Sequence, residues 1–285
     1  MKVLVTGSEG FIGSHLCRQL QDPFRFDLKI GFDLGNFDQV AETFKSFKPE
    51  VVIHLGGNAY VGYAKENPDK DVTTNVIGTL NVLKASVDIK PKIIFTSTAQ
   101  VYGTYTDKVI EESFQENPVH PYAISKLSAE HYCRWFSQNF GLNVCVLRFS
   151  NVYGFGRNSD VFADFIKMAR EDHVIRIKGN PYNAPDFVNV NDVVRAIIHI
   201  KDAPLKGFEV YNVCYGESVT ILSIAEKIAD FFGAKVEYNP KSSSLDSKTF
   251  HLSNEKICKA LGWKPEVSLA EGLRKMLERA KALNP

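Results

Sequence analysis

Hydrophobic residues form two alternating patterns along the first half of the chain. Short continuous apolar runs, rich in β-branched residues, predict buried strands at 3–5, 51–55, 93–96 and 144–148. Longer stretches between them carry apolar residues at helical spacing, at 14–20, 37–47, 69–85 and 122–140. This alternation predicts an α/β fold in which helices wrap a parallel sheet.

One part of this pattern is contracted. Between Pro23 and Asn36 there is room for one comfortable strand, where a complete mononucleotide-binding half supplies two. Asn36 is a good N-cap residue for the helix at 37–47. We therefore expect the second and third strands to be shortened or merged.

The regular alternation of predicted strands and helices ends at Asn151, and strands and helices then follow in mixed order. Helices are expected at 162–170, 191–200, 221–232, 253–261 and 269–283, and strands at 174–177 and 210–213. This predicts a domain of residues 1–150, to which the chain returns at 186–215, and a smaller mixed α/β domain within 151–285. Residues 104–121 are expected to form a loop, and 241–244 the most mobile loop.

Composition narrows the class of protein. The 285 residues are 44% hydrophobic and 24% charged, with a net charge of +1, so no global field favours nucleic acid or an anionic membrane. The five cysteines form no C-x-x-C pair, which argues against a zinc site or a disulfide framework. No apolar run reaches the ~20 residues of a membrane span, and the N-terminus lacks a signal pattern. We expect a cytoplasmic protein.

A glycine loop follows the first strand. Gly7, Gly10 and Gly13 stand at three-residue spacing between that strand and a helix that starts near Ser14. Glycine permits a tight turn and a close backbone approach, and the free N–H groups of a helix start attract an anion. The loop therefore predicts a site for a dinucleotide pyrophosphate.

A second candidate site lies near the middle of the chain. Tyr122 and Lys126 are four residues apart on one helix, hence on one face. A lysine ammonium near a phenol lowers the phenol's pKa, so Tyr122 could exchange a proton with a sugar hydroxyl. Thr98 ends a buried strand, where ligands bind in open α/β sheets, and could bind the same oxygen.

The histidines indicate no metal site. His54, His120 and His251 do not stand at ligand spacing from carboxylates or cysteines. They are better explained as one buried strand histidine and two loop histidines.

An ordered set of motifs resembles a known family. In chain order these are Gly7-x-x-Gly10-x-x-Gly13, His54-Leu55-Gly56-Gly57, Asn75, Ser97-Thr98-x-x-Val101-Tyr102-Gly103, Tyr122-x-x-x-Lys126, Arg148-x-x-Asn151-Val152-Tyr153-Gly154, Asp186-Phe187-Val188, Tyr211-Asn212-Val213 and Leu261-Gly262-Trp263-x-Pro265. Each is weak alone, but together they span nearly the whole chain. The chain resembles the extended short-chain dehydrogenases/reductases, in the branch of nucleotide-sugar epimerases and dehydratases.

The resemblance implies a doubly wound Rossmann sheet that binds NAD or NADP, with a smaller domain for a nucleotide sugar. Tyr122 would be the acid/base, Lys126 would bind the nicotinamide ribose, and Thr98 would orient the reacting hydroxyl. The implied cofactor residues are Gly7, Gly10, Phe11, Ile12, Gly13, Asp33, Leu34, Leu55, Gly56, Gly57, Asn75, Thr96, Tyr122 and Lys126. The implied substrate residues are Thr98, Gln100, Asn151, Arg157 and Phe187.

Two departures from the family pattern bear on the reaction. An acidic pair usually follows the catalytic threonine in dehydratases, but here Ala99 and Gln100 follow it, which disfavours 4,6-dehydration. Pro185 stands where an arginine usually meets the nucleotide phosphates. Arg157 or Lys178 could replace that arginine, or the nucleotide could differ.

The adenosine end of the cofactor is less determined. Asp27 and Asp33 compete to bind the ribose because the second strand is contracted. Arg25 and Lys29 could accept a 2′-phosphate or could be solvated strand-edge charges. The choice between NAD and NADP stays open.

The first hypothesis for the function is 4-epimerisation of a nucleotide hexose by hydride transfer at C4. The second is reduction of a nucleotide 4-keto-6-deoxysugar, and the third is a dinucleotide-binding sensor without catalysis. The resemblance further implies a homodimer built from the helices at 69–85 and 122–140.

Overall fold

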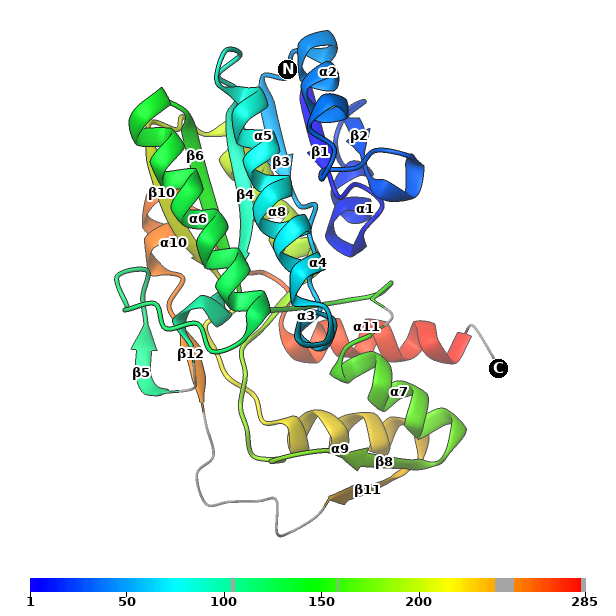
Figure 1. The fold of residues 1–285 in the computed structure, drawn as a ribbon. Coiled ribbons are helices and arrows are strands. Elements are labelled where there is room, and N and C mark those ends of the chain that lie inside the picture. Colours follow the sequence, from blue (N-terminus) through cyan, green and yellow to red (C-terminus); the bar gives the residue numbers. More distant parts are fainter. Residues whose placement is uncertain (104–105, 158, 239–248, 283–285) are drawn as a thin grey trace.

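A six-stranded parallel sheet forms the centre of the molecule (Figure 1). The computed structural model describes residues 1–103, 106–157, 159–238 and 249–282. The strand order is β10-β6-β4-β3-β1-β2 and every neighbouring pair is parallel. The strands are β1 (Val3–Thr6), β2 (Phe24–Phe26), β3 (Val51–His54), β4 (Lys92–Thr98), β6 (Asn143–Phe149) and β10 (Phe208–Val213). The predicted α/β doubly wound sheet is confirmed.

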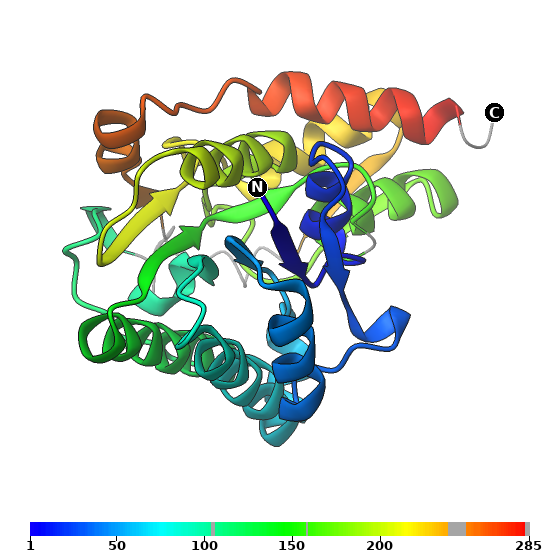
Figure 2. The same cartoon turned by 90° about the horizontal axis from the view of Figure 1, so that it is seen from above.

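Helices cover both faces of this sheet, as the view from above shows (Figure 2). On one face lie α1 (Phe11–Cys17) and α8 (Val190–Asp202), which share a core with the sheet and Trp263. On the other face lie α2 (Phe37–Phe47), α5 (Gly78–Ser86) and α6 (Pro121–Phe140), with a second core. The nearly continuous apolar character of the strands is explained by burial on both sides.

The expected contraction at the edge of the sheet is confirmed. β2 has three residues and is followed by a single 3-10 turn, Leu28–Ile30, instead of a further strand. The Asp27 side chain accepts a hydrogen bond from Lys29 N and starts this turn, and Gly31 ends it with a φ of +92°. Asn36 then caps α2 through its side-chain oxygen, as predicted.

The second half of the chain builds a layer beyond the carboxyl ends of the strands (Figure 1). Its own apolar core joins α7 (Val161–Glu171), β8 (Val174–Ile177), α9 (Ile221–Phe232) and α11 (Leu269–Ala282). β11 (Lys235–Tyr238) pairs in parallel with β8. The short strands β7 (Asn151–Tyr153) and β9 (Phe187–Asn189) pair where the chain leaves the large sheet and returns to it. This layer closes the carboxyl edge of the sheet.

Several elements differ from the prediction. Residues 104–121 are not all loop, because β5 (Thr106–Ile110) pairs in parallel with β12 (Phe250–Leu252). The expected helix at 69–85 is interrupted: α4 (Pro68–Val72) passes through a π-helical turn, Thr73–Ile77, into α5.

Two shorter helices complete the fold. They are α3 (Val61–Glu66), which was not expected, and α10 (Glu255–Leu261). The expected mobile loop at 241–244 lies outside the described residues. Within the described ranges, no helix has both the length and the apolar character needed to cross a membrane.

Candidate active site

The glycine loop is packed so tightly that side chains do not fit. Gly7 has a φ of +69°, and a Cβ there would lie 2.7 Å from Gly56 N. A Cβ on Gly13 would lie 2.1 Å from the carbonyl oxygen of Gly7. Both positions require glycine, one for backbone conformation and contact, the other for contact. The loop therefore brings bare backbone to the surface beside α1.

A cavity of about 500 Å³ opens over this loop; we call it the glycine-loop cavity. It reaches from the loop to the carboxyl end of β4 and the start of α6. Its lining includes ten of the expected cofactor residues, namely Gly7, Gly10, Phe11, Ile12, Gly13, Leu55, Gly57, Thr96, Tyr122 and Lys126. Because these glycines have no Cβ, space remains beside the bare backbone of the loop, and Lys126 adds a positive charge nearby. Such a space fits the elongated, anionic dinucleotide that the motifs imply.

Asn75 stands behind this cavity rather than in its lining. Its Oδ1 accepts a hydrogen bond from Asn58 N at 2.8 Å, and its Nδ2 donates to Asp71 Oδ1 and Ser125 Oγ, both at 3.0 Å. These bonds join the loop after β3, the π-helical turn and α6. Asn75 thereby supports the wall of the cavity, and its side chain is buried.

The two competing aspartates occupy different places. Asp27 directly follows β2 and accepts hydrogen bonds from Glu9 N in the glycine loop (3.0 Å) and from Lys29 N (2.9 Å). Asp33 is exposed and accepts from Gly35 N, while its neighbour Leu34 is buried. Neither aspartate is among the lining residues, although Lys29 is.

Tyr122 and Thr98 meet at the carboxyl end of β4. The Thr98 hydroxyl lowers the pKa of Tyr122, yet burial dominates and raises this pKa to about 12. The expected net lowering of the pKa is therefore wrong, because the buried phenol has lost its hydration. Burial lowers the pKa of Lys126 to about 8, and its ammonium lies 4.3 Å from the centroid of the Phe95 ring.

Beyond Thr98 lies a cavity of about 340 Å³, which we call the Thr98 cavity. Its polar lining comes from Thr98, Gln100, His120, Ser150 and Asn151, and much of the rest is apolar. The apolar lining consists of Val61, Ala99, Val119, Phe149, Pro185 and Phe250. A sugar-sized ligand in this cavity would lie next to Thr98.

A neighbouring cavity of about 320 Å³, the Phe187 cavity, shares Asn151 and Pro185 with the Thr98 cavity. It is also lined by Arg157 and Phe187, so each of the five expected substrate residues lines one of these two cavities. Arg157 also lines the glycine-loop cavity and donates to the carbonyl of Val152 at 2.7 Å. Lys178, the alternative to Arg157, is exposed and lines neither cavity.

Other motif residues hold the framework below the site. Arg148 is buried and forms an ion pair with Glu130 at 2.6 Å, and Glu130 also accepts a hydrogen bond from Ser97. Asp186 is buried and accepts from Tyr215 N at 3.0 Å and Gly216 N at 2.6 Å. Burial raises the pKa of Asp186 to about 6. These groups fix β4, β6 and the loop after β10 relative to one another.

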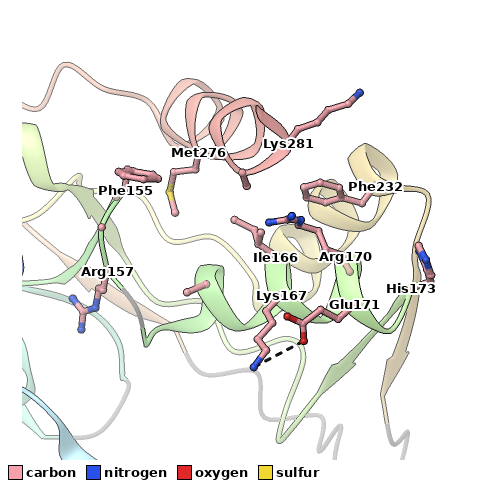
Figure 3. A pocket seen from close by; sticks show the side chains of 15 residues that line it. Phe155, Arg157, Ile166, Lys167, Arg170, Glu171, His173, Phe232, Met276 and Lys281 are labelled. Atoms are coloured by element: carbon pink, nitrogen blue, oxygen red, sulfur yellow. Dashed lines mark ion pairs between the residues drawn. The ribbon is translucent and has the colours of Figure 1, made fainter. Parts of the chain in front are cut away.

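A larger cavity of about 790 Å³ lies between α7, α9 and α11, and Arg157 lines it as well (Figure 3). Ile166, Phe232 and Met276 form its apolar part, and Arg170 points into it. The ion pair of Lys167 and Glu171, at 3.9 Å, lies on its rim. Since Thr98, Tyr122 and Lys126 do not line it, size alone does not locate the chemistry.

The histidines divide between structure and site. His54 is buried between Thr6 Oγ1, 2.6 Å from its Nδ1, and Thr79 Oγ1, 3.0 Å from its Nε2. His120 lines the Thr98 cavity, a position that its loop context did not predict. In the part of the chain that is described, no group of three or more histidines, cysteines or carboxylates is placed to hold a metal ion.

Fold and site together define a dinucleotide-binding α/β enzyme with a tyrosine–lysine pair in the glycine-loop cavity and a second cavity nearby. The chain belongs to the NAD dependent epimerase/dehydratase family, whose family model matches residues 3–214. It is 32% identical over 256 residues to UDP-glucuronate 4-epimerase of Thermodesulfobacterium geofontis, covering 87% of this chain and 78% of that protein. It is 29% identical to GDP-6-deoxy-D-mannose reductase of Pseudomonas aeruginosa, covering 97% and 96%.

Solved structures agree with this assignment. UDP-glucose 4-epimerase of Thermotoga maritima with UDP-glucose superposes with a TM-score of 0.90 at 30% identity, covering all of both chains. RMD of Pseudomonas aeruginosa in complex with NADPH has a TM-score of 0.87 at 27% identity, covering 99% of this chain and 100% of that one. The chain is thus an NAD(P)-dependent enzyme that modifies nucleotide sugars.

Proposed function

We propose that this enzyme is a nucleotide-sugar 4-epimerase. The observation that carries the proposal is the position of Tyr122, which lines the glycine-loop cavity and lies next to Thr98, a lining residue of the Thr98 cavity. A sugar carbon held beside Tyr122 lies between a proton acceptor and a nicotinamide. Residues 1–150 and the return at 186–215 would hold the dinucleotide, and the remainder of 151–285 the nucleotide sugar.

In the proposed reaction Tyr122 takes the proton of the C4 hydroxyl while Thr98 holds that oxygen by a hydrogen bond. A dinucleotide held in the glycine-loop cavity would supply a reversible hydride acceptor at C4, and the 4-keto sugar would turn before C4 is reduced again on its opposite face. Tyr122 then gives the proton back. The phenol pKa of about 12 must fall for this, and the Lys126 ammonium in the same cavity favours the phenolate.

The residues after Thr98 argue against dehydration. Elimination of water needs an acid and a base near C5 and C6, and the side chains at these positions are Ala99 and Gln100. Both line the Thr98 cavity, so the sugar would meet a methyl group and a neutral amide there. The sugar carbons beyond C4 would keep their substituents.

A second candidate is reduction of a nucleotide 4-keto-6-deoxysugar. Lys29 lines the glycine-loop cavity, as does Glu9. Arg25 forms an ion pair with Glu9, with 3.1 Å between Arg25 Nη1 and Glu9 Oε1. These two cations suit a 2′-phosphate, as the NADPH-bound relative would require. In this reaction Tyr122 would act as the acid.

Measurements of turnover with and without added dinucleotide distinguish an epimerase from a reductase. An epimerase loaded with NAD should interconvert UDP-glucose and its 4-epimer with no net change in absorbance at the wavelength of NADH. A reductase should oxidise one NADPH for each 4-keto sugar.

In either assay Tyr122→Phe should lower kcat by about 10²–10⁴-fold and leave dinucleotide affinity unchanged. Tyr132→Phe, an exposed phenol on the same helix, is the matched control. Unchanged kcat in Tyr122→Phe contradicts the mechanism.

We further propose a homodimer through the outer faces of α4, α5 and α6. Exposed apolar side chains gather there, at Val72, Ile77, Ile124, Tyr132 and Trp135. Burying them against a second copy would form a four-helix interface. Light scattering at micromolar concentration should give twice the chain mass, and Trp135→Glu should give a monomer.

A further inference from the structure

His120 stands at the junction of α6 and the Thr98 cavity. It is the N-cap of α6, and its Nδ1 accepts a hydrogen bond from Ala123 N at 3.2 Å. Its ring is parallel to that of Tyr122, with an interplanar angle of 6° and 6.1 Å between centroids. The same ring lines the cavity together with Thr98 and Gln100. It therefore lies beside the proposed acid/base.

The cap bond defines the tautomer of this histidine. A backbone N–H can only donate, so Nδ1 must keep its lone pair, and the proton of the neutral ring is then on Nε2. Because Nδ1 faces the helix, Nε2–H lies on the opposite edge of the ring. His120 is thus a fixed hydrogen-bond donor on the wall of the cavity.

The charges around His120 favour the neutral ring. Burial lowers its pKa, the Lys65 ammonium on α3 lowers it further, and the Asp71 carboxylate on α4 raises it. On α6 itself the neighbouring titratable group is Tyr122, whose raised pKa keeps it uncharged at neutral pH. Of the described residues that line the Thr98 cavity, His120 alone is ionisable.

We propose that His120 is a substrate-binding residue whose Nε2–H donates a hydrogen bond to a sugar oxygen next to the carbon that reacts at Tyr122. The inference rests on the proposed function, which it extends to recognition of the sugar. Val61, Val119 and Phe250 form the apolar part of the surrounding wall, and Gln100, Ser150 and Asn151 the other polar part. A hydroxyl oxygen of a sugar held among them is a suitable acceptor for the Nε2–H donor. The ring would thereby orient the sugar against Tyr122 and select substrates with that hydroxyl.

His120→Asn is the discriminating variant. Asparagine is a strong N-cap, so the start of α6 is retained while the ring and its Nε2–H are removed. We expect kcat/KM for the nucleotide sugar to fall about tenfold, the factor that follows from one lost hydrogen bond. His199→Asn, at an exposed histidine in the last turn of α8, should change nothing. Equal melting temperatures of both variants and the wild type show that folding is intact.

Two further readouts separate substrate binding from a structural role. In the wild type, kcat/KM should fall at acid pH, because protonation of Nδ1 breaks the cap bond that orients the ring. Since the pKa of His120 is lowered, the fall should lie below the ordinary histidine value of about 6.5. This fall of kcat/KM at low pH, the acid limb of the pH profile, should be absent in His120→Asn and present in His199→Asn. A nucleotide sugar that lacks the neighbouring hydroxyl should be a poor substrate for the wild type, and His120→Asn should discriminate against it about tenfold less.

The outcomes are distinguishable. If the wild type converts nucleotide sugars and His120→Asn keeps its kcat/KM or the acid limb, the assignment of His120 is overturned and the proposed function stands. If the wild type converts no nucleotide sugar in either direction, both are overturned.

Discussion

The glycine-loop cavity and the Thr98 cavity share the lining residue Phe149 but are built differently. Backbone forms much of the first, where Gly7 and Gly13 leave no room for a Cβ. Side chains from distant segments form the second, among them Val61, Val119 and Phe250. The backbone contacts of the first cavity depend on the conformation of the whole loop. A wall made of side chains can instead be changed by a single substitution. A fold of this kind can keep its cofactor and exchange its sugar.

The largest expected effect concerns the buried His54, which lies below the glycine loop and supports it. Burial lowers the pKa of His54 to about 3, so stability is complete above pH 6.5 and is lost as the pH falls towards 3. The shift corresponds to about 5 kcal/mol. Urea unfolding of the wild type across this range should show the loss, and His54→Asn, which cannot titrate, should show it much less. His199→Asn should follow the wild type; a parallel decline in His54→Asn would remove His54 as the cause.

The next effect tests the backbone cradle itself. Gly13→Ala places a Cβ 2.1 Å from the Gly7 carbonyl, which must move. Overpacking costs up to ~3 kcal/mol, so dinucleotide affinity should fall about 100-fold in calorimetric titration. Gly62→Ala, where a Cβ meets nothing within 4 Å, should bind as the wild type does. If both variants bind the dinucleotide with equal affinity, the loop adjusts to the added Cβ more easily than its packing indicates.

A smaller effect is expected where the cavities join. Arg157 lines both the glycine-loop cavity and the Phe187 cavity. Arg157→Gln should raise KM for the nucleotide sugar about tenfold, through loss of a charge-assisted contact to phosphate. Lys178→Gln removes an exposed charge outside these cavities and should leave KM unchanged. The reverse result would make Lys178 the replacement for the missing arginine at Pro185.

The smallest effect concerns the two aspartates. Asn at position 27 can accept only one of the two N–H groups, from Glu9 and Lys29, that Asp27 binds with separate oxygens. Asp27→Asn should therefore weaken dinucleotide binding about fivefold, roughly 1 kcal/mol. Asp33→Asn should have no effect on binding, because Asp33 accepts from Gly35 N, which lies outside the cavity lining, whereas Asp27 holds the lining residue Glu9. Titration of NAD and NADP against both variants measures this and shows which dinucleotide is preferred.

Local patterns in the sequence predict the large sheet well. Val3–Thr6, Val51–His54 and Asn143–Phe149 are buried on both faces, so their apolar runs are clear. β5 could not be predicted, because its partner β12 is at residues 250–252 and the pairing depends on the finished fold. The π-helical turn at Thr73–Ile77 also escapes a periodic pattern, since its sequence continues the helical stripe.

The site divides in the same way. Glycine spacing indicates the loop because steric exclusion acts between near neighbours such as Gly7 and Gly13. The position of His120 in a cavity wall depends on β12 and β7, which supply Phe250 and Asn151. The pKa of Tyr122 likewise reflects burial by the whole fold, which the spacing to Lys126 does not report.

The pairing of β5 with β12 has a consequence for how the protein is made. Once Val213 has left the ribosome, all six strands of the large sheet are available, and this sheet can form. The wall of the Thr98 cavity that holds Phe250 must wait for the last tenth or so of the chain. During synthesis the enzyme would therefore gain a place for its cofactor before it gains a place for its sugar.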